Sequence, residues 1–124
     1  MRRTHERIPR VDMVGGLHYR PGEDIVFTVD FKSELKTVDP ATYTYKLVTE
    51  PVLWAPAGRP RVKVPRMEWT TTSMFVVDVM KVLTVRIPAL DATPWHDIPQ
   101  RALLYATSPD GITWVVTELL ISVE

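Results

Sequence analysis

The chain has 124 residues, 45% of them hydrophobic, and its 15 basic and 15 acidic side chains leave no formal net charge. This length and composition fit one domain with a real hydrophobic core, and they exclude a chain whose overall charge attracts nucleic acid. The absence of cysteine excludes a disulfide scaffold and a thiolate metal site, and no apolar run is long enough to span a bilayer. Residues 1–7 carry charge without an apolar stretch behind them, so we expect no secretory signal.

Residues 1–16 show neither the period of a strand nor that of a helix, and Pro9 and Gly15-Gly16 interrupt them. We interpret this segment as an extended N-terminal arm, and a disordered terminus is the alternative. The arm is basic, since Glu6 is the only acidic residue among the first ten. We predict that its arginines bind a partner: Arg2, Arg3, Arg7 and Arg10.

Two alternating segments follow the arm. Residues 17–20 lead into a turn at Pro21-Gly22, and residues 25–31 then alternate between apolar and polar side chains. After the polar residues 33–40, the segment 41–48 alternates again. Each alternating segment predicts a half-buried strand. The side chains that we expect to face the core are Ile25, Phe27, Val29, Phe31, Tyr43, Tyr45 and Leu47.

Residues 50–66 hold four prolines and Gly58, which excludes a central strand because proline cannot donate to the ladder. They predict a long loop, with an edge hairpin at residues 61–64 as an option. Loops of this length in compact domains are usually functional or disordered. One cluster of cations in this loop has no acidic residue among it, and we predict that it docks on an acidic protein surface together with Trp54: Arg59, Arg61, Lys63 and Arg66.

Strands resume after the loop, at residues 67–72, 75–80, 83–87, 101–107 and 112–123. Residues 90–96 fit one short helical turn with Asp91 as its cap. The sequence Ser108-Pro109-Asp110-Gly111 is typical of a type I turn between two antiparallel strands. About seven short strands at regular spacing predict an all-β fold, a single antiparallel immunoglobulin-like β-sandwich over residues 17–124. We expect its core to include Val85 and Tyr105.

The residues that most often carry catalysis are poorly placed for it. His5, His18 and His96 have no spacing that pairs them with another histidine or a carboxylate on one face, and His96-Asp97 would point to opposite faces of a strand. The chain has no calcium loop with regular aspartate spacing, no glycine-rich phosphate loop and no Gly-x-Ser-x-Gly. We therefore expect no enzyme activity, no cofactor and no metal.

Four tryptophans are more than the average for this length. We expect Trp114 in the core, because it lies in the final hairpin. Trp54 and Trp95 lie beside proline-rich loops and are candidates for an exposed platform for a partner chain or a sugar ring. We favour a partner chain, because no pattern of polar residues flanks them. Aromatic residues do not interleave with the basic loop, so we expect no nucleic acid there.

The segment Tyr19-Arg20-Pro21-Gly22-Glu23-Asp24-Ile25-Val26-Phe27-Thr28-Val29 resembles the opening of phage virion β-sandwich domains. The nearest of these are the N-terminal domains of baseplate upper proteins and the related fibre adaptors of heads and tails. The closing pattern, with Leu83-Thr84-Val85-Arg86-Ile87-Pro88, Ala102-Leu103-Leu104-Tyr105-Ala106, Asp110-Gly111 and Ile121-Ser122-Val123, is also similar, so that the resemblance spans residues 17–124.

This resemblance implies a structural role in a virion, an assembly of repeated copies and no catalysis. The fibre adaptors usually continue into a coiled coil, whereas this chain ends at Glu124, so a decoration or connector protein is the expectation. The expected partners are other virion proteins of a capsid or tail and further copies of the chain, with neither nucleic acid nor membrane. The alternative is a carbohydrate-binding β-sandwich module that uses exposed tryptophan.

Overall fold

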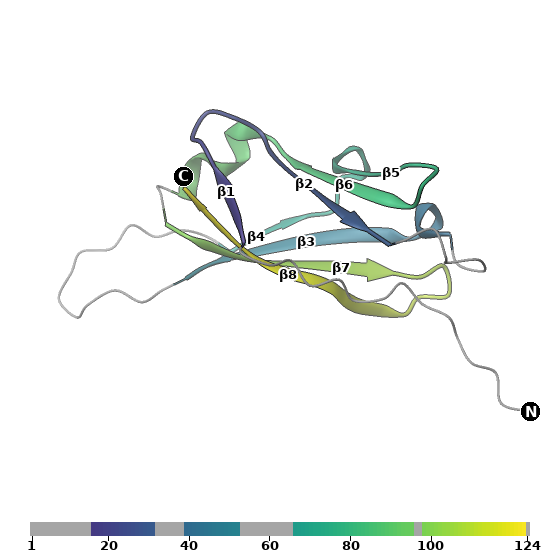
Figure 1. The fold of residues 1–124 in the computed structure, drawn as a ribbon. Helices are drawn as coiled ribbons and strands as arrows, with labels where there is room; N and C mark the ends of the chain where they lie inside the picture. Colours follow the sequence, from purple (N-terminus) through teal and green to yellow (C-terminus); the bar gives the residue numbers. More distant parts are fainter. Residues whose placement is uncertain (1–15, 32–38, 53–65, 96–97, 124) are drawn as a thin grey trace, which may run out of the picture.

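The computed structural model describes residues 16–31, 39–52, 66–95 and 98–123 (Figure 1). These residues form eight strands: β1 Leu17–Tyr19, β2 Ile25–Asp30, β3 Thr44–Pro51, β4 Met67–Trp69, β5 Phe75–Val77, β6 Val82–Ile87, β7 Gln100–Thr107 and β8 Thr113–Val123. Three 3-10 helices connect them: η1 Pro40–Thr42, η2 Thr72–Met74 and η3 Ala89–Trp95. No helix among the described residues is long and apolar enough to cross a membrane.

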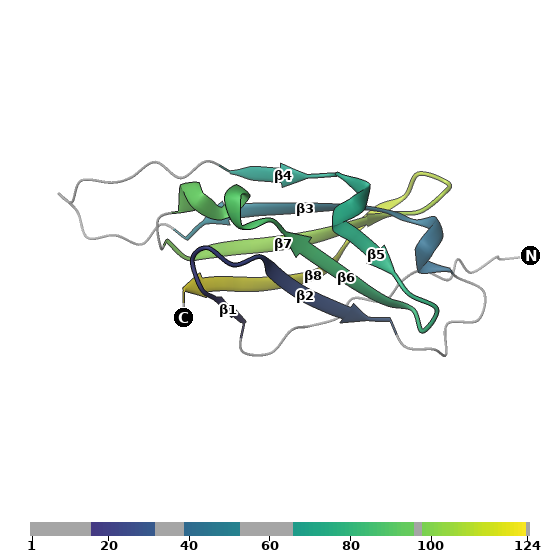
Figure 2. The ribbon, with the colours of Figure 1, turned by 90° about the horizontal axis from the view of Figure 1, so that it is seen from above.

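The strands form a five-stranded sheet in the order β1-β8-β7-β3-β4 and a three-stranded sheet in the order β2-β6-β5. The smaller sheet covers one face of the larger one (Figures 1 and 2). With β2, β6 and β5 as strands B, E and D, and β8, β7 and β3 as strands G, F and C, this is the strand order of an immunoglobulin sandwich. The predicted all-β sandwich is confirmed, with eight described strands rather than about seven. One pair departs from the antiparallel prediction, because β1 runs parallel to β8 along the sheet edge.

The core lies between the two sheets and follows from the alternation of the strands. In β2 every second side chain is buried, and Phe27 lies opposite Val85 of β6. Seven of the predicted core residues are buried: Ile25, Phe27, Val29, Phe31, Tyr45, Leu47 and Val85. On the side of the larger sheet, Leu104 and Ile121 complete the core, and neither residue has any exposed surface.

Tyr105 was expected in the core, and that prediction is wrong. The buried residues of β7 are at even positions, where the small side chains of Ala102 and Ala106 leave room for the smaller sheet. Tyr105 therefore faces outward and is half-buried, with the ammonium of Lys46 5.0 Å from its ring centre. Tyr43 is also only half-buried, and packs against the rim of the core.

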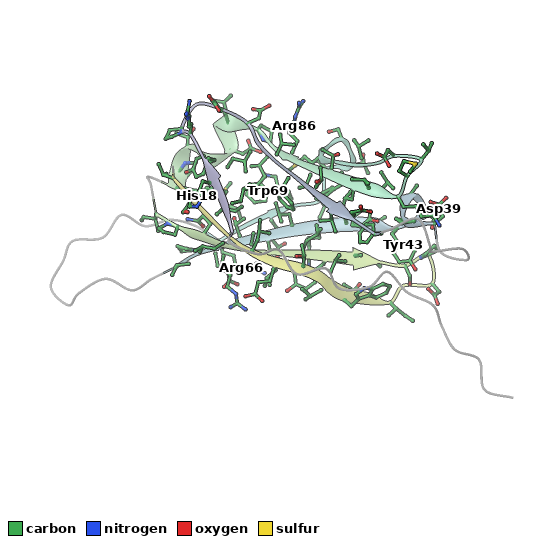
Figure 3. The ribbon with its side chains drawn as sticks, viewed as in Figure 1. His18, Asp39, Tyr43, Arg66, Trp69 and Arg86 are labelled. Atoms are coloured by element: carbon green, nitrogen blue, oxygen red, sulfur yellow. The ribbon has the colours of Figure 1, made fainter. Side chains whose placement is uncertain are left out.

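Trp95 corrects a second prediction, since it was expected on the surface and is fully buried. The helix η3, close to the predicted helical turn, directs this indole between the sheets. There its ring meets Tyr19 and Trp69 edge to face, with centroids 5.8 and 6.4 Å apart. Figure 3 shows Trp69 between the two sheets. Trp114, expected in the core, is half-buried and lies edge to face on Tyr43.

Two predicted strands end early, the first of them because a side chain stabilises the turn that follows it. Oδ1 of Asp78 accepts hydrogen bonds from the backbone N–H groups of Met80 and Val82, so β5 stops at Val77. The strand predicted from Met67 stops at Trp69, where the chain crosses to the smaller sheet through η2. The predicted turn at residues 108–111 is confirmed by a 2.9 Å bond from Gly111 N–H to the Ser108 carbonyl.

Candidate protein-contact surfaces

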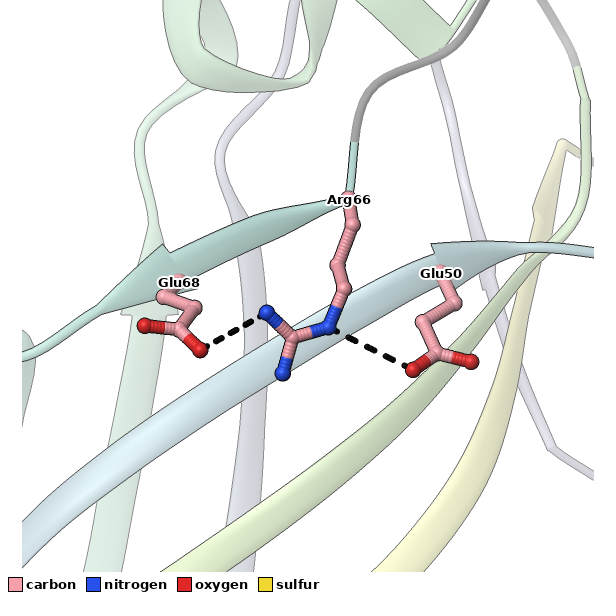
Figure 4. Close-up of polar contacts among 3 residues, drawn as sticks. All are labelled: Glu50, Arg66 and Glu68. Atoms are coloured by element: carbon pink, nitrogen blue, oxygen red, sulfur yellow. Dashed lines mark hydrogen bonds and ion pairs between the residues drawn. The ribbon is translucent and has the colours of Figure 1, made fainter.

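Only one of the predicted partner-binding residues lies in the described part of the chain. Arg66 directly precedes β4, and its guanidinium is close to two carboxylates (Figure 4). Nη1 is 2.8 Å from Glu68 Oε1, and Nε is 3.4 Å from Glu50 Oε1. The other predicted residues lie outside the described ranges: Arg2, Arg3, Arg7, Arg10, Trp54, Arg59, Arg61 and Lys63. The predicted edge hairpin at residues 61–64 and the histidines His5 and His96 lie outside them too.

The neighbours of Arg66 change the interpretation of its charge. The hydrogen bond to Glu68 and the nearby carboxylates raise the pKa of the guanidinium above its ordinary value. The pair is exposed, so it adds little to stability. Its effect is that Arg66 contributes no net positive charge to this region. Its predicted contact with an acidic partner stays a prediction.

The outward side of the five-stranded sheet, here named the outer sheet face, has an apolar centre. Val48 of β3 points away from the core yet is only 1% exposed, and it lies beside Leu103 of β7 and Glu68 of β4. Leu103 and Tyr105 are half-buried, while Leu120 of β8 is 46% exposed. Side chains that lie opposite each other on adjacent strands of a sheet pack together and stabilise it.

Paired charges surround this apolar centre. Arg101 Nε donates to Glu118 Oε1 over 2.6 Å, and this bond raises the pKa of the Arg101 guanidinium. Among the described residues the face is neutral, with three cations and three carboxylates: Lys46, Arg66 and Arg101 with Glu50, Glu68 and Glu118.

A groove of about 690 Å³ opens at the end of the sandwich where β3 begins, and is here named the β3–β5 groove. Figure 3 places Tyr43 at this end, near Asp39. The lining is mainly aromatic, aliphatic and hydroxyl-bearing, and comes from η1, β3, the β4–η2 connection, β5 and the β7–β8 hairpin: Ala41, Tyr43, Thr44, Tyr45, Lys46, Thr70, Thr72, Phe75, Val76, Val77, Thr107 and Thr113.

The groove is suited to binding. Tyr45 and Phe75 stack with their ring centres 5.9 Å apart, and the Tyr45 hydroxyl donates to the Pro40 carbonyl over 2.7 Å. Burial raises the pKa of Tyr45, and Tyr43 and Asp39 add to the effect. The hydroxyl is therefore a fixed neutral donor. Among the described residues, the lining includes one ionic side chain, Lys46, and neither histidine nor carboxylate.

The described residues show no group of three or more histidine, aspartate or glutamate side chains that could hold a metal ion. His18 is exposed on β1 and its Nδ1 lies 3.1 Å from the Ser122 hydroxyl. Three oxygen atoms are buried on the inner side of the larger sheet without a hydrogen-bond partner among the described residues: Thr49 Oγ1, Gln100 Oε1 and Thr117 Oγ1.

Comparison of the chain with models of known protein families, with curated proteins and with solved structures returns no match. The class of protein that the fold defines is thus an immunoglobulin-like β-sandwich, with two candidate contact surfaces, the outer sheet face and the β3–β5 groove.

The sequence interpretation missed both surfaces. A signal for the outer sheet face exists in residues 46–50, where Val48 stands at an outward position between Lys46 and Glu50. The groove has no comparable signal, because its walls come from segments as far apart as Ala41 and Thr113.

Proposed function

We propose that the chain is a non-catalytic structural protein that works as repeated copies, of the kind that the phage-virion resemblance implies. Capsid or tail decoration and connector proteins are the class meant. The proposal depends chiefly on one observation, the outer sheet face with its apolar centre and its balanced charges.

The physical support comes from the arrangement of that face. Interfaces between proteins commonly have an apolar centre and a polar rim. A charge costs most on burial when it loses its partner, and Arg66 and Arg101 bring their carboxylate partners with them. A neutral surface also does not repel an identical surface. The face is therefore suited to a two-fold contact between copies, in which the same residues meet on both sides.

The position of Trp95 weakens the carbohydrate-binding alternative. It relied on exposed Trp54 and Trp95, and Trp95 is fully buried. Trp54 lies outside the described residues.

A pair of matched substitutions tests the proposed contact. Leu120 on the outer sheet face and Val26 on the outward side of the three-stranded sheet are 46% and 43% exposed. Each lies opposite an arginine of the neighbouring strand, Arg101 and Arg86 respectively. Leu120→Glu and Val26→Glu therefore introduce the same charge in comparable surroundings on opposite sides of the molecule.

Sedimentation velocity of the full chain over a range of concentrations is the measurement. We expect the wild type and Val26→Glu to self-associate alike, and Leu120→Glu to weaken the association by roughly tenfold or more, equal to about 1.4 kcal/mol. Circular dichroism checks that both variants remain folded. A wild type that stays monomeric, or equal association of both variants, would overturn the proposed contact.

A further inference from the structure

The β3–β5 groove lies between two strand edges that are open in the described part of the chain. On β3, β4 pairs only with Leu47, Val48 and Thr49, so the beginning of β3 extends beyond the end of β4. On the smaller sheet, β5 pairs with β6 on one side and is the last strand on the other. An edge strand presents backbone N–H and C=O groups that can pair with another extended chain.

Successive residues of β3 direct their backbone N–H and C=O groups to alternate sides of the strand, and one residue directs them toward the groove. The N–H of Ser108 bonds to Ile112, so Ser108 points toward β8 and Thr107 toward β3. Thr44 and Lys46 therefore pair with β7, and the backbone of Tyr45 between them points to the open edge. No backbone hydrogen bond of Tyr45 to a residue outside the sheet is found among the described residues.

The same argument applies to β5. The N–H of Asp78 bonds to the carbonyl of Val82, so Val76 pairs with Thr84 and Val77 points away from β6. Phe75, Val76 and Val77 form an edge without charge or proline, the features that usually protect edges. Val76 is 57% exposed.

The side chains of the groove indicate what an added strand would carry. Half-buried Tyr43 and Phe75 can receive an apolar side chain, whereas the Lys46 ammonium lies over the outward-facing Tyr105 ring. Asp39 and Asp78 are exposed next to the lining residues, two before Ala41 and one after Val77. The complementary segment is thus apolar on the side that enters the groove, with cations at its flank.

We propose that the N-terminal arm of a second copy adds to the β5 edge as a strand and fills the β3–β5 groove. Its residues Val11 and Met13 provide apolar side chains on one face of an extended strand, with Asp12 on the other face, and Arg7 and Arg10 precede them as partners for Asp39 or Asp78. The four residues 11–14 in an extended chain cover about 13 Å, enough to pass the three residues of β5. Strand addition of this kind gives affinity through the backbone and specificity through side-chain pockets.

This inference rests on the proposed assembly of repeated copies and gives it a second contact. The outer sheet face meets an identical face, whereas an arm in a groove joins two different surfaces. Contacts of the second kind close into rings or continue as open chains. Together the two contacts would extend an assembly beyond a dimer.

The absence of cysteine allows a direct test with full-length chains. One copy carries Met13→Cys and the other carries Thr72→Cys, an exposed residue that lines the groove. Thr28→Cys, exposed on the outward side of β2, replaces Thr72→Cys in the control. After mild oxidation, a non-reducing gel measures the disulfide-linked heterodimer, which forms only when the two Cα atoms come within about 7 Å. We expect at least a fivefold higher yield of the heterodimer with Thr72→Cys than with Thr28→Cys.

Proline substitutions in the chain that carries Thr72→Cys test whether the arm pairs with the backbone of β5. Val77→Pro removes an N–H that points to the open edge, so we expect the chain to stay folded and the cross-link yield to fall to the control level. Val76→Pro removes an N–H that pairs with Thr84, so we expect it to lower the thermal midpoint instead.

Equal yields with Thr72→Cys and Thr28→Cys, or a yield unchanged by Val77→Pro, would overturn the inference. A disulfide within one chain carrying both Met13→Cys and Thr72→Cys, with no bond between copies, would overturn it as well. The proposed function fails separately, because the effect of Leu120→Glu on self-association does not depend on the groove.

Discussion

At the residue scale, Tyr45 connects the core to the groove. Its ring is buried and stacks on Phe75, while its hydroxyl donates to the Pro40 carbonyl at the start of η1. Burial raises the pKa of this hydroxyl, because the ionised form would lose its hydration. The bond to Pro40 also holds η1 against β3, and thereby shapes one wall of the groove.

The raised pKa of Tyr45 predicts a loss of stability in alkaline solution. Above about pH 10 the unfolded chain releases the Tyr45 proton while the folded chain keeps it, so the free energy of unfolding falls by up to about 1.4 kcal/mol per pH unit. Tyr45→Phe lacks this group and the hydrogen bond to Pro40, so we expect it to be less stable by about 1 kcal/mol at pH 8.

Urea unfolding of both proteins at pH 8 and pH 11 measures the effect. We expect the deficit of Tyr45→Phe to shrink or reverse at pH 11, and the other tyrosines cancel in the difference. The same deficit at both pH values would contradict the shifted pKa.

At the element scale, β2 shows how alternation produces the sandwich. Its buried residues all lie on one face, and its register with β6 sets Phe27 against Val85. A slip of one residue would turn the buried side chains of β2, Ile25, Phe27 and Val29, to solvent. The outward side of β2 carries Val26, Thr28 and Asp30, which can remain in water.

Phe27→Ala is expected to cost about 3–5 kcal/mol, because it leaves a cavity where a side chain only 4% exposed had packed between the sheets. Chemical denaturation measures the free energy of unfolding. Thr28→Ala, on the exposed side of the same strand, is the control and should change it by less than about 0.5 kcal/mol. A loss below about 1 kcal/mol for Phe27→Ala would contradict the register.

At the scale of the whole molecule, two candidate contact surfaces lie on different parts of the sandwich. The outer sheet face belongs to the larger sheet, and the β3–β5 groove lies at one end between the sheets. If copies use both, the arm is needed for growth of the assembly and the sheet face for the contact between identical surfaces.

A chain without residues 1–16 is therefore expected to fold, because the core of the described part is built from residues between Ile25 and Ile121, but to stop assembling at the dimer. Sedimentation velocity compares its largest species with that of the full chain, and the thermal midpoint checks folding. Species as large as those of the full chain would contradict the role of the arm.

The alternation of residues 25–31 and 41–48 and the turn at residues 108–111 determined the fold class before any tertiary information. These signals are local, since strand period and turn chemistry depend on near neighbours in the chain. Seven of the nine predicted core residues are buried for the same reason. The positions of Tyr105 and Trp95 were not predictable in this way, because each depends on what packs opposite: small alanines let β7 turn its even positions inward, and η3 directs an indole between the sheets.

The candidate surfaces were decided by the tertiary structure. Arg66 pairs with Glu68, two residues along the chain, and also with Glu50, sixteen residues away, which only the β3–β4 pairing brings to it. The groove exists only because β4 ends at Trp69 while β3 begins earlier, and because β5 belongs to the other sheet. Contacts between distant segments depend on the order of the strands in each sheet and on where the strands end. The hydrophobic period of a single segment predicts neither of these.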